Sequence, residues 1–183
     1  VYIIHNTFVN MGVINLGSSK VTNVTFANNI FKKSPGGIFR YPSNNETWIG
    51  NIYSGSLGIT INSGMTNADP LLEMNSDGYY GLSSGSPAID ASVSGYPSII
   101  DILNIDDDPN LIFDISGQSR SDVDTLKVVG CDEFSSDSIT IHPLKLSEVG
   151  PSYLGGPQAE VLAEQTISFP ALASKIYGDP DFS

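Results

Sequence analysis

The first 62 residues of this 183-residue chain contain a repeat of 22 to 23 residues. Within each copy, an apolar position, an asparagine and an aromatic position follow one another at constant offsets. The three columns are Ile3/Phe26/Trp48, Asn6/Asn29/Asn51 and Phe8/Phe31/Tyr53. A unit this short cannot bury a hydrophobic core alone, so successive copies must stack on one another.

Each copy holds a second apolar segment, which begins at Gly12, Gly37 and Gly58 in the three units. The apolar segments are only about 3–5 residues long, and no helical periodicity lies between them. This pattern argues against α/β units and against leucine-rich repeats. It predicts an all-β fold of the parallel β-helix type, in which matching side chains stack roughly 4.8 Å apart.

The asparagine column is expected to have a structural role. Asn6, Asn29 and Asn51 would lie above one another at a bend, where side-chain amides can form a ladder of hydrogen bonds. The aromatic and aliphatic columns would then fill the interior of the coil. We therefore predict a structural ladder at these asparagines and no catalytic site.

The charge of the chain is unevenly distributed. The net charge is −12, yet residues 1–62 hold four basic residues and a single acidic one, Glu46. The acidic remainder argues against a nucleic-acid partner. No apolar run approaches the roughly 18 residues that a membrane span requires. Because Val1 falls inside a repeat with no capping segment before it, we expect the chain to be part of a longer protein.

Several other polar residues are expected to be structural. Cys131 is the single cysteine, so no internal disulfide can form, and it is predicted to be a small buried residue. A lone histidine such as His5 is more often structural than catalytic. Lys32 and Lys33 are expected on a solvated edge, and the Asp106–Asp108 run in a surface loop, although hard carboxylate oxygens would also suit calcium.

Three groups of motifs follow the repeats in a fixed order. They are residues 68–71, 78–82 and 86–91; then Asp114-Ile115-Ser116-Gly117-Gln118-Ser119-Arg120; then residues 127–135, Pro143-Leu144 and residues 149–154. The first group resembles the C-terminal closing region of secreted right-handed β-helix proteins, a signal shared by several families. The groups from Asp114 onward, in this order, resemble the C-terminal end of the chondroitinase B-like alginate lyases, polysaccharide lyase family 6. The resemblance covers roughly residues 1–154. It departs at Cys131, where a small residue such as Ala is expected, and in a longer segment between Tyr96 and Asp114.

The resemblance implies a right-handed parallel β-helix and an intact parent that cleaves alginate or a related uronate polymer by β-elimination. It further implies a catalytic Lys/Arg pair, and calcium held by one Asn and two Glu, on coils N-terminal to Val1. Residues 1–62 contain only Glu46 as an acidic side chain, so no catalytic or metal-binding residue is assigned within this chain. The fragment alone is expected to be inactive.

Substrate-binding residues are predicted at Arg40 and Tyr41. Arg40 follows a predicted strand and precedes Pro42, so its planar guanidinium would project from a turn and could bind a sugar carboxylate. Tyr41 could stack on a pyranose ring. In the closing motifs, Asp90, Asp132 and Glu133 are expected to accept backbone N–H bonds and cap turns.

Two other functions remain open. A non-catalytic adhesin or carbohydrate-binding module would use the same coil without the Lys/Arg pair. A pectinase-type hydrolase would need paired carboxylates, which residues 1–62 do not supply.

The last part of the chain differs in character. Gly155-Gly156-Pro157 opens a predicted linker over residues 155–163. Residues 164–183 resemble the first strands of an MBG-type immunoglobulin-like repeat, a module common in secreted bacterial proteins. The resemblance implies a secreted, cell-surface or periplasmic protein.

Overall fold

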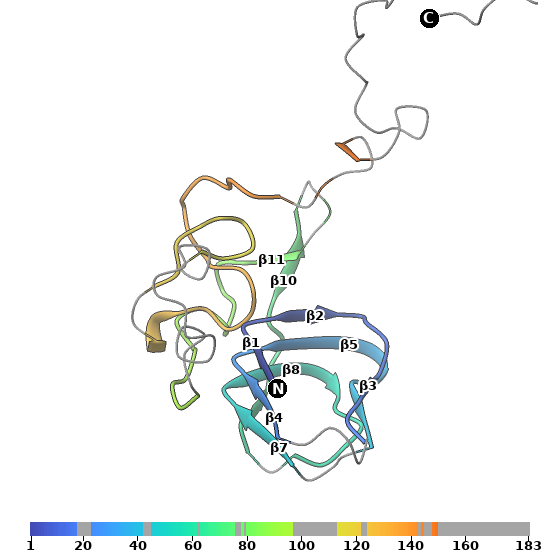
Figure 1. Ribbon diagram of the computed structural model, residues 1–183. Helices are drawn as coiled ribbons and strands as arrows, with labels where there is room; N and C mark the ends of the chain where they lie inside the picture. Colours follow the sequence, from blue (N-terminus) through green and yellow to red (C-terminus); the bar gives the residue numbers. More distant parts are fainter. Residues whose placement is uncertain are drawn as a thin grey trace, which may run out of the picture. The chain divides into compact units, whose positions relative to one another are not determined.

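The computed structural model (Figure 1) describes residues 1–17, 23–41, 45–61, 63–75, 78, 80–96, 113–121, 124–142, 144 and 148–149. Contacts within the chain define two compact units, residues 1–143 and 144–183. The first unit holds all strands and side-chain contacts discussed below. The predicted linker and MBG-type module at 155–183, and the predicted boundary at residue 154, lie outside the described residues.

The repeat units supply the strands of three parallel sheets. The first sheet has the order β1-β4-β7, the second β2-β5-β8-β9 and the third β3-β6. In Figure 1, β1, β4 and β7 lie side by side, and so do β2, β5 and β8. The first sheet comprises β1 (Tyr2–Ile4), β4 (Val24–Ala27) and β7 (Glu46–Ile49); the second β2 (Thr7–Val9), β5 (Ile30–Gly37), β8 (Asn51–Ser56) and β9 (Met65–Asn67); the third β3 (Ile14–Asn15) and β6 (Phe39–Arg40).

The predicted columns are confirmed by the strand register. Ile3 pairs with Phe26 and Phe26 with Trp48, whose rings stack at 4.5 Å between centroids. Phe8 likewise pairs with Phe31 and stacks on it at 5.0 Å. Phe39 closes the interior from the third sheet, edge-on to Phe31 at 4.9 Å. Each edge-to-face or stacked pair adds about 0.5–1.5 kcal/mol beyond burial alone.

The asparagine ladder is also confirmed. Asn29 Oδ1 accepts the Asn6 backbone N–H at 2.9 Å, and Asn51 Oδ1 accepts the Asn29 backbone N–H at 3.0 Å. Asn29 Nδ2 donates to Asn51 Oδ1 at 2.9 Å and to the Ile3 carbonyl at 2.8 Å. Because Asn29 and Asn51 are fully buried, these bonds satisfy polar groups that water cannot reach.

A corner of the coil precedes each ladder asparagine. His5, Asn28 and Gly50 occupy equivalent places and all have left-handed backbone angles, with φ of 51°, 51° and 60°. Glycine adopts this conformation readily, and asparagine and histidine do so more often than most residues. The corner turns the chain from the first sheet into the second.

One predicted alignment is wrong. The repeat placed Gly58 in register with Gly37, but the structure pairs Gly37 with Ser56. The register shifts between Lys33 and Gly37, where β5 carries extra residues that β8 lacks. Since the insertion follows Lys33, it displaces the second apolar segment of the third unit, which begins at Gly58, and leaves the three columns intact.

Parallel stacking ends after β9. The next two strands, β10 (Leu72–Met74) and β11 (Tyr80–Leu82), pair antiparallel, and Asp124–Leu126 form a 3-10 turn, η2. Side chains from this closing region cover the outer side of the second sheet: Ile30 and Ile52 pack with Ala88, Val128 and Val129. Residue alternation explains this, because Ile30 points outward where its neighbour Phe31 points into the coil.

The described part of the protein is therefore all-β and contains parallel sheets built from successive repeats. None of the described residues forms a helix with the length and hydrophobicity needed to cross a membrane.

Candidate functional site

Arg40 and Tyr41 lie together at the end of the third sheet. Phe39 and Arg40 form β6, in which Phe39 is buried in the coil and Arg40 is exposed. The alternation of a strand thus turns the guanidinium outward. Tyr41 follows at the corner and is 60% exposed. The structure brings the two predicted substrate-binding residues into contact with each other.

The Arg40 side chain is held from two sides. Its Nε donates to Asn15 Oδ1 at 2.8 Å, and its guanidinium carbon lies 4.9 Å from the Tyr41 ring centroid. Asn15 pairs with Arg40 in the β3–β6 register, so it belongs to the preceding coil. The hydrogen bond at Nε and the contact with the aromatic ring both restrict the orientation of the guanidinium.

Tyr41 has an unusual backbone conformation for an aromatic residue. Its φ is 60°, in the left-handed region, which is uncommon outside glycine and a few polar residues. Gly17 of the preceding coil leaves the space that Tyr41 needs: a Cβ at Gly17 would meet the Tyr41 Cβ and lie 2.8 Å from its carbonyl oxygen. Such strain occurs at sites where the surrounding structure determines the conformation.

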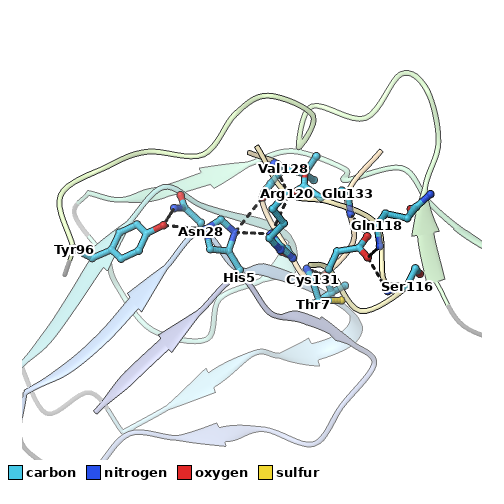
Figure 2. A network of polar contacts seen from close by, with 12 residues as sticks. His5, Thr7, Asn28, Tyr96, Ser116, Gln118, Arg120, Val128, Cys131 and Glu133 are labelled. Carbon is cyan, nitrogen blue, oxygen red and sulfur yellow. Dashed lines mark hydrogen bonds and ion pairs between the residues drawn. The ribbon is translucent and has the colours of Figure 1, made fainter. Parts of the chain in front are cut away.

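A second polar cluster joins the closing region to the coil (Figure 2). Arg120 Nη1 forms an ion pair with Glu133 Oε1 at 3.0 Å, and Nη2 donates to the Gly130 carbonyl at 3.1 Å. The two side chains are only 10% and 8% exposed. Glu133 also accepts the Val128 backbone N–H at 3.3 Å. The pair therefore holds the 128–133 segment in its bent shape.

His5 connects this cluster to the corner of the coil. Its Nδ1 lies 3.1 Å from the Val128 carbonyl oxygen and 3.4 Å from Arg120 Nη1. Its Nε2 lies 2.9 Å from the Tyr96 hydroxyl. Asn28, at the next corner, exchanges hydrogen bonds with the backbone of Val93 at 2.9 and 3.0 Å. These contacts, drawn in part in Figure 2, are those of a structural junction, in agreement with the interpretation of His5.

The carboxylates of the closing region bond mainly to the backbone. Asp114 accepts the N–H groups of Ser116, Gln118 and Glu133 at 2.7–2.8 Å. Asp132 accepts the Leu82 N–H at 3.2 Å, so the predicted capping role is confirmed for Asp132 and for Glu133. Burial is the largest cause that raises the pKa of both Asp132 and Glu133 above the ordinary values.

Two other predictions about single residues were tested. Cys131 is partly buried, where the sequence predicted a buried residue, and its backbone N–H donates to the Thr7 hydroxyl at 3.1 Å. Burial raises the pKa of its thiol. The edge position predicted for Lys32 and Lys33 is wrong, because both lie in β5, which pairs with β2 on one side and with β8 on the other. The partly exposed Lys32 side chain pairs with Asp69 at 2.8 Å. This pair also lowers the pKa of Asp69, with the Lys32 hydrogen bond as the main cause.

The remaining site predictions have different outcomes. The Asp106–Asp108 loop lies outside the described residues. Among the residues that the structure does describe, no group of three or more His, Cys, Asp or Glu side chains could hold a metal ion.

Sequence reasoning missed Asn15 and Arg120. Asn15 could have been found from the second apolar segment of each unit, since aligning Ile14 with Phe39 places Asn15 beside Arg40. Arg120 offered no such signal, because its partner Glu133 is fixed only when the closing region folds back on itself.

No protein-family model matches the sequence, and no curated protein matches it. Among solved structures, the chain is similar to a mutant of AlyGC, a PL6 family alginate lyase, with a TM-score of 0.36 and 20% sequence identity. The match covers 54% of this chain and 17% of that chain.

Proposed function

We propose that the chain is the C-terminal part of a secreted polysaccharide lyase whose parent cleaves alginate or a related uronate polymer by β-elimination. On this proposal the three parallel sheets are faces of a right-handed parallel β-helix, and residues 68–142 close it. The ligand of the parent is an anionic polysaccharide.

One observation carries the proposal: the motif residues that resemble the family are those that attach the closing region to the coil. Gly130 donates its N–H to the Asn28 carbonyl at 2.9 Å, and Cys131 donates to the Thr7 hydroxyl at 3.1 Å. Asp114, Arg120 and Glu133 hold the same segment in place. The motif residues that resemble the lyase family thus all help to attach the closing region to the coil. This shared structural role favours a common way of closing the coil over a chance match of short motifs.

The chemistry divides between this chain and its parent. β-Elimination removes the proton next to the uronate carboxylate, and that proton is barely acidic until the carboxylate charge is neutralised. The proposal assigns the base, the Lys/Arg pair and the calcium ligands to the parent outside residues 1–183. Arg40 and Tyr41 of this chain would bind a sugar unit of the polymer without taking part in proton transfer.

The test is an assay of the full-length parent on alginate and other uronate polymers, with the 183-residue chain as a matched control. We expect unsaturated uronate ends to accumulate with the parent and not with the chain alone. Binding of the polymer by the parent without any unsaturated product would contradict the lyase proposal and favour the adhesin or carbohydrate-binding module.

A further inference from the structure

The edge of the Arg40 guanidinium formed by Nη1 and Nη2 makes no hydrogen bond or ion pair with the described residues. Nε is bonded to Asn15 and the flat face lies over Tyr41, while Nη1 and Nη2 have no hydrogen-bond or ion-pair partner in the described part of the chain. These two nitrogens form a planar fork of N–H donors. Such a fork matches the two oxygens of a carboxylate.

The surroundings of this fork are built to keep it in one position. Asn15 is fixed by its register with Arg40, and the Leu16 N–H donates to the Arg40 carbonyl at 2.9 Å. Tyr41 holds a left-handed conformation that needs a glycine at position 17. Ordering a long side chain before the ligand arrives lowers the entropy cost of binding.

Among the described residues, no carboxylate forms an ion pair with Arg40. In the described part of the chain, Asp69 pairs with Lys32 and Glu133 pairs with Arg120. The residue that pairs with Arg40 in the β3–β6 register is Asn15, which is neutral and whose Oδ1 accepts from Arg40 Nε. An arginine that is oriented by a neutral amide remains available to an external anion.

We infer that Asn15, Arg40 and Tyr41 form a carboxylate clamp that binds one uronate unit of a polysaccharide. The Arg40 fork grips the carboxylate, the exposed Tyr41 ring contacts the sugar, and Asn15 is a positioning residue. The inference rests on the proposed function for the class of polymer, but it concerns binding and involves no bond cleavage.

The experiment measures the affinity of the 183-residue chain by calorimetry for a short oligouronate prepared from alginate and for its carboxyl-reduced counterpart. We expect the carboxyl-reduced oligosaccharide to bind at least about tenfold more weakly, the size expected from one charge-assisted hydrogen-bonded contact. Equal affinity for the two ligands, or no binding of the oligouronate, would overturn the clamp.

Four variants separate the clamp from general charge attraction. Arg40→Ala and Arg40→Lys should both lose roughly tenfold or more, because lysine keeps the charge without the planar fork. Lys33→Gln removes one positive charge from β5 of the same coil and should bind within about twofold of the unmodified chain. Asn15→Asp keeps the acceptor for Nε but adds a negative charge, so it should weaken oligouronate binding while leaving the affinity for the reduced ligand unchanged.

Circular dichroism should show unchanged folding for all four. If Lys33→Gln and Arg40→Ala weaken binding equally, charge alone explains the affinity and the clamp is wrong. The lyase proposal has a separate test. If the parent forms unsaturated products and its Arg40→Ala variant has an unchanged KM, the clamp is wrong and the lyase proposal stands. If the oligouronate binds through Arg40 but the parent forms no unsaturated products, the clamp stands and the lyase proposal is wrong.

Discussion

The coil and the closing region of this protein are stabilised in different ways. In the coil, strands from successive repeats pair in parallel, and side chains of the same kind stack in columns, such as the aromatic rings of Phe26 and Trp48. In the closing region, few strands form, and buried polar side chains such as Asp114 bond directly to backbone groups. The coil is stabilised by the same kind of contact in each repeat, whereas the closing region is stabilised by individual contacts that do not recur.

Substitutions in the two regions should therefore affect stability in different ways. A substitution in a column of the coil removes one contact among several similar ones above and below it. A substitution in the closing region removes the sole partner of a buried polar group, which costs the desolvation of that group. The coil should therefore lose stability in proportion to lost packing, while the closing region should open locally.

The largest effect is expected from the aromatic interior. Phe31→Ala should lower the free energy of unfolding by about 3–5 kcal/mol, because a fully buried ring leaves a cavity between Phe8, Phe26 and Phe39. Urea unfolding followed by circular dichroism measures the change. Thr47→Ala, on an exposed position of β7, is the control and should change stability by less than about 0.5 kcal/mol.

Loss of the buried ion pair should destabilise the closing region and leave the coil stable. Arg120→Met leaves the Glu133 carboxylate buried without its cation, at a cost of about 3 kcal/mol. In hydrogen exchange, the amides of Val129 and Gly130 should lose protection, while those of Phe31 and Ile52 in the coil keep it. Equal loss of protection in both regions would show that they unfold as one cooperative unit.

A ladder asparagine should give a smaller effect. Asn29→Ala leaves the Asn6 N–H and the Ile3 carbonyl without their partners, so about 1–3 kcal/mol of stability should be lost. Here the coil amides should lose protection first, the reverse of Arg120→Met. Comparing the exchange patterns of the two variants tests whether the regions are held independently.

The smallest expected effect is a dependence on pH. The pKa of Glu133 is raised above its ordinary value of 4.5, mainly by burial, so the folded state holds this proton more tightly than the unfolded state. Protonated Glu133 therefore contributes to the free energy of unfolding. This contribution is fully present below the pKa of Glu133 in the unfolded state and is lost as the pH rises through its pKa in the folded state. Glu133→Gln should make the stability decline less between acidic and neutral pH, measured by urea unfolding across that range. An unchanged slope would assign the dependence to other groups, such as Asp132.

Much of the coil could be predicted from the sequence. The columns at Ile3/Phe26/Trp48 and Phe8/Phe31/Tyr53 and the ladder at Asn6/Asn29/Asn51 are confirmed, because each rests on a constant spacing. The prediction failed at Gly58, where an insertion within β5 changed the spacing. The lyase activity, the calcium requirement of the parent and the substrate-binding role of Arg40 and Tyr41 stay predictions.

The sequence by itself determined which residues stack, since a periodic pattern specifies neighbours through backbone pairing alone. Only the tertiary structure decided which single residues meet across the closing region. Arg120 finds Glu133, and His5 finds Val128 and Tyr96, over separations that no local pattern encodes. The same is true of Arg40, whose orientation depends on Asn15 in the preceding coil. Periodic contacts repeat a local rule, whereas these contacts exist only after the chain has closed on itself.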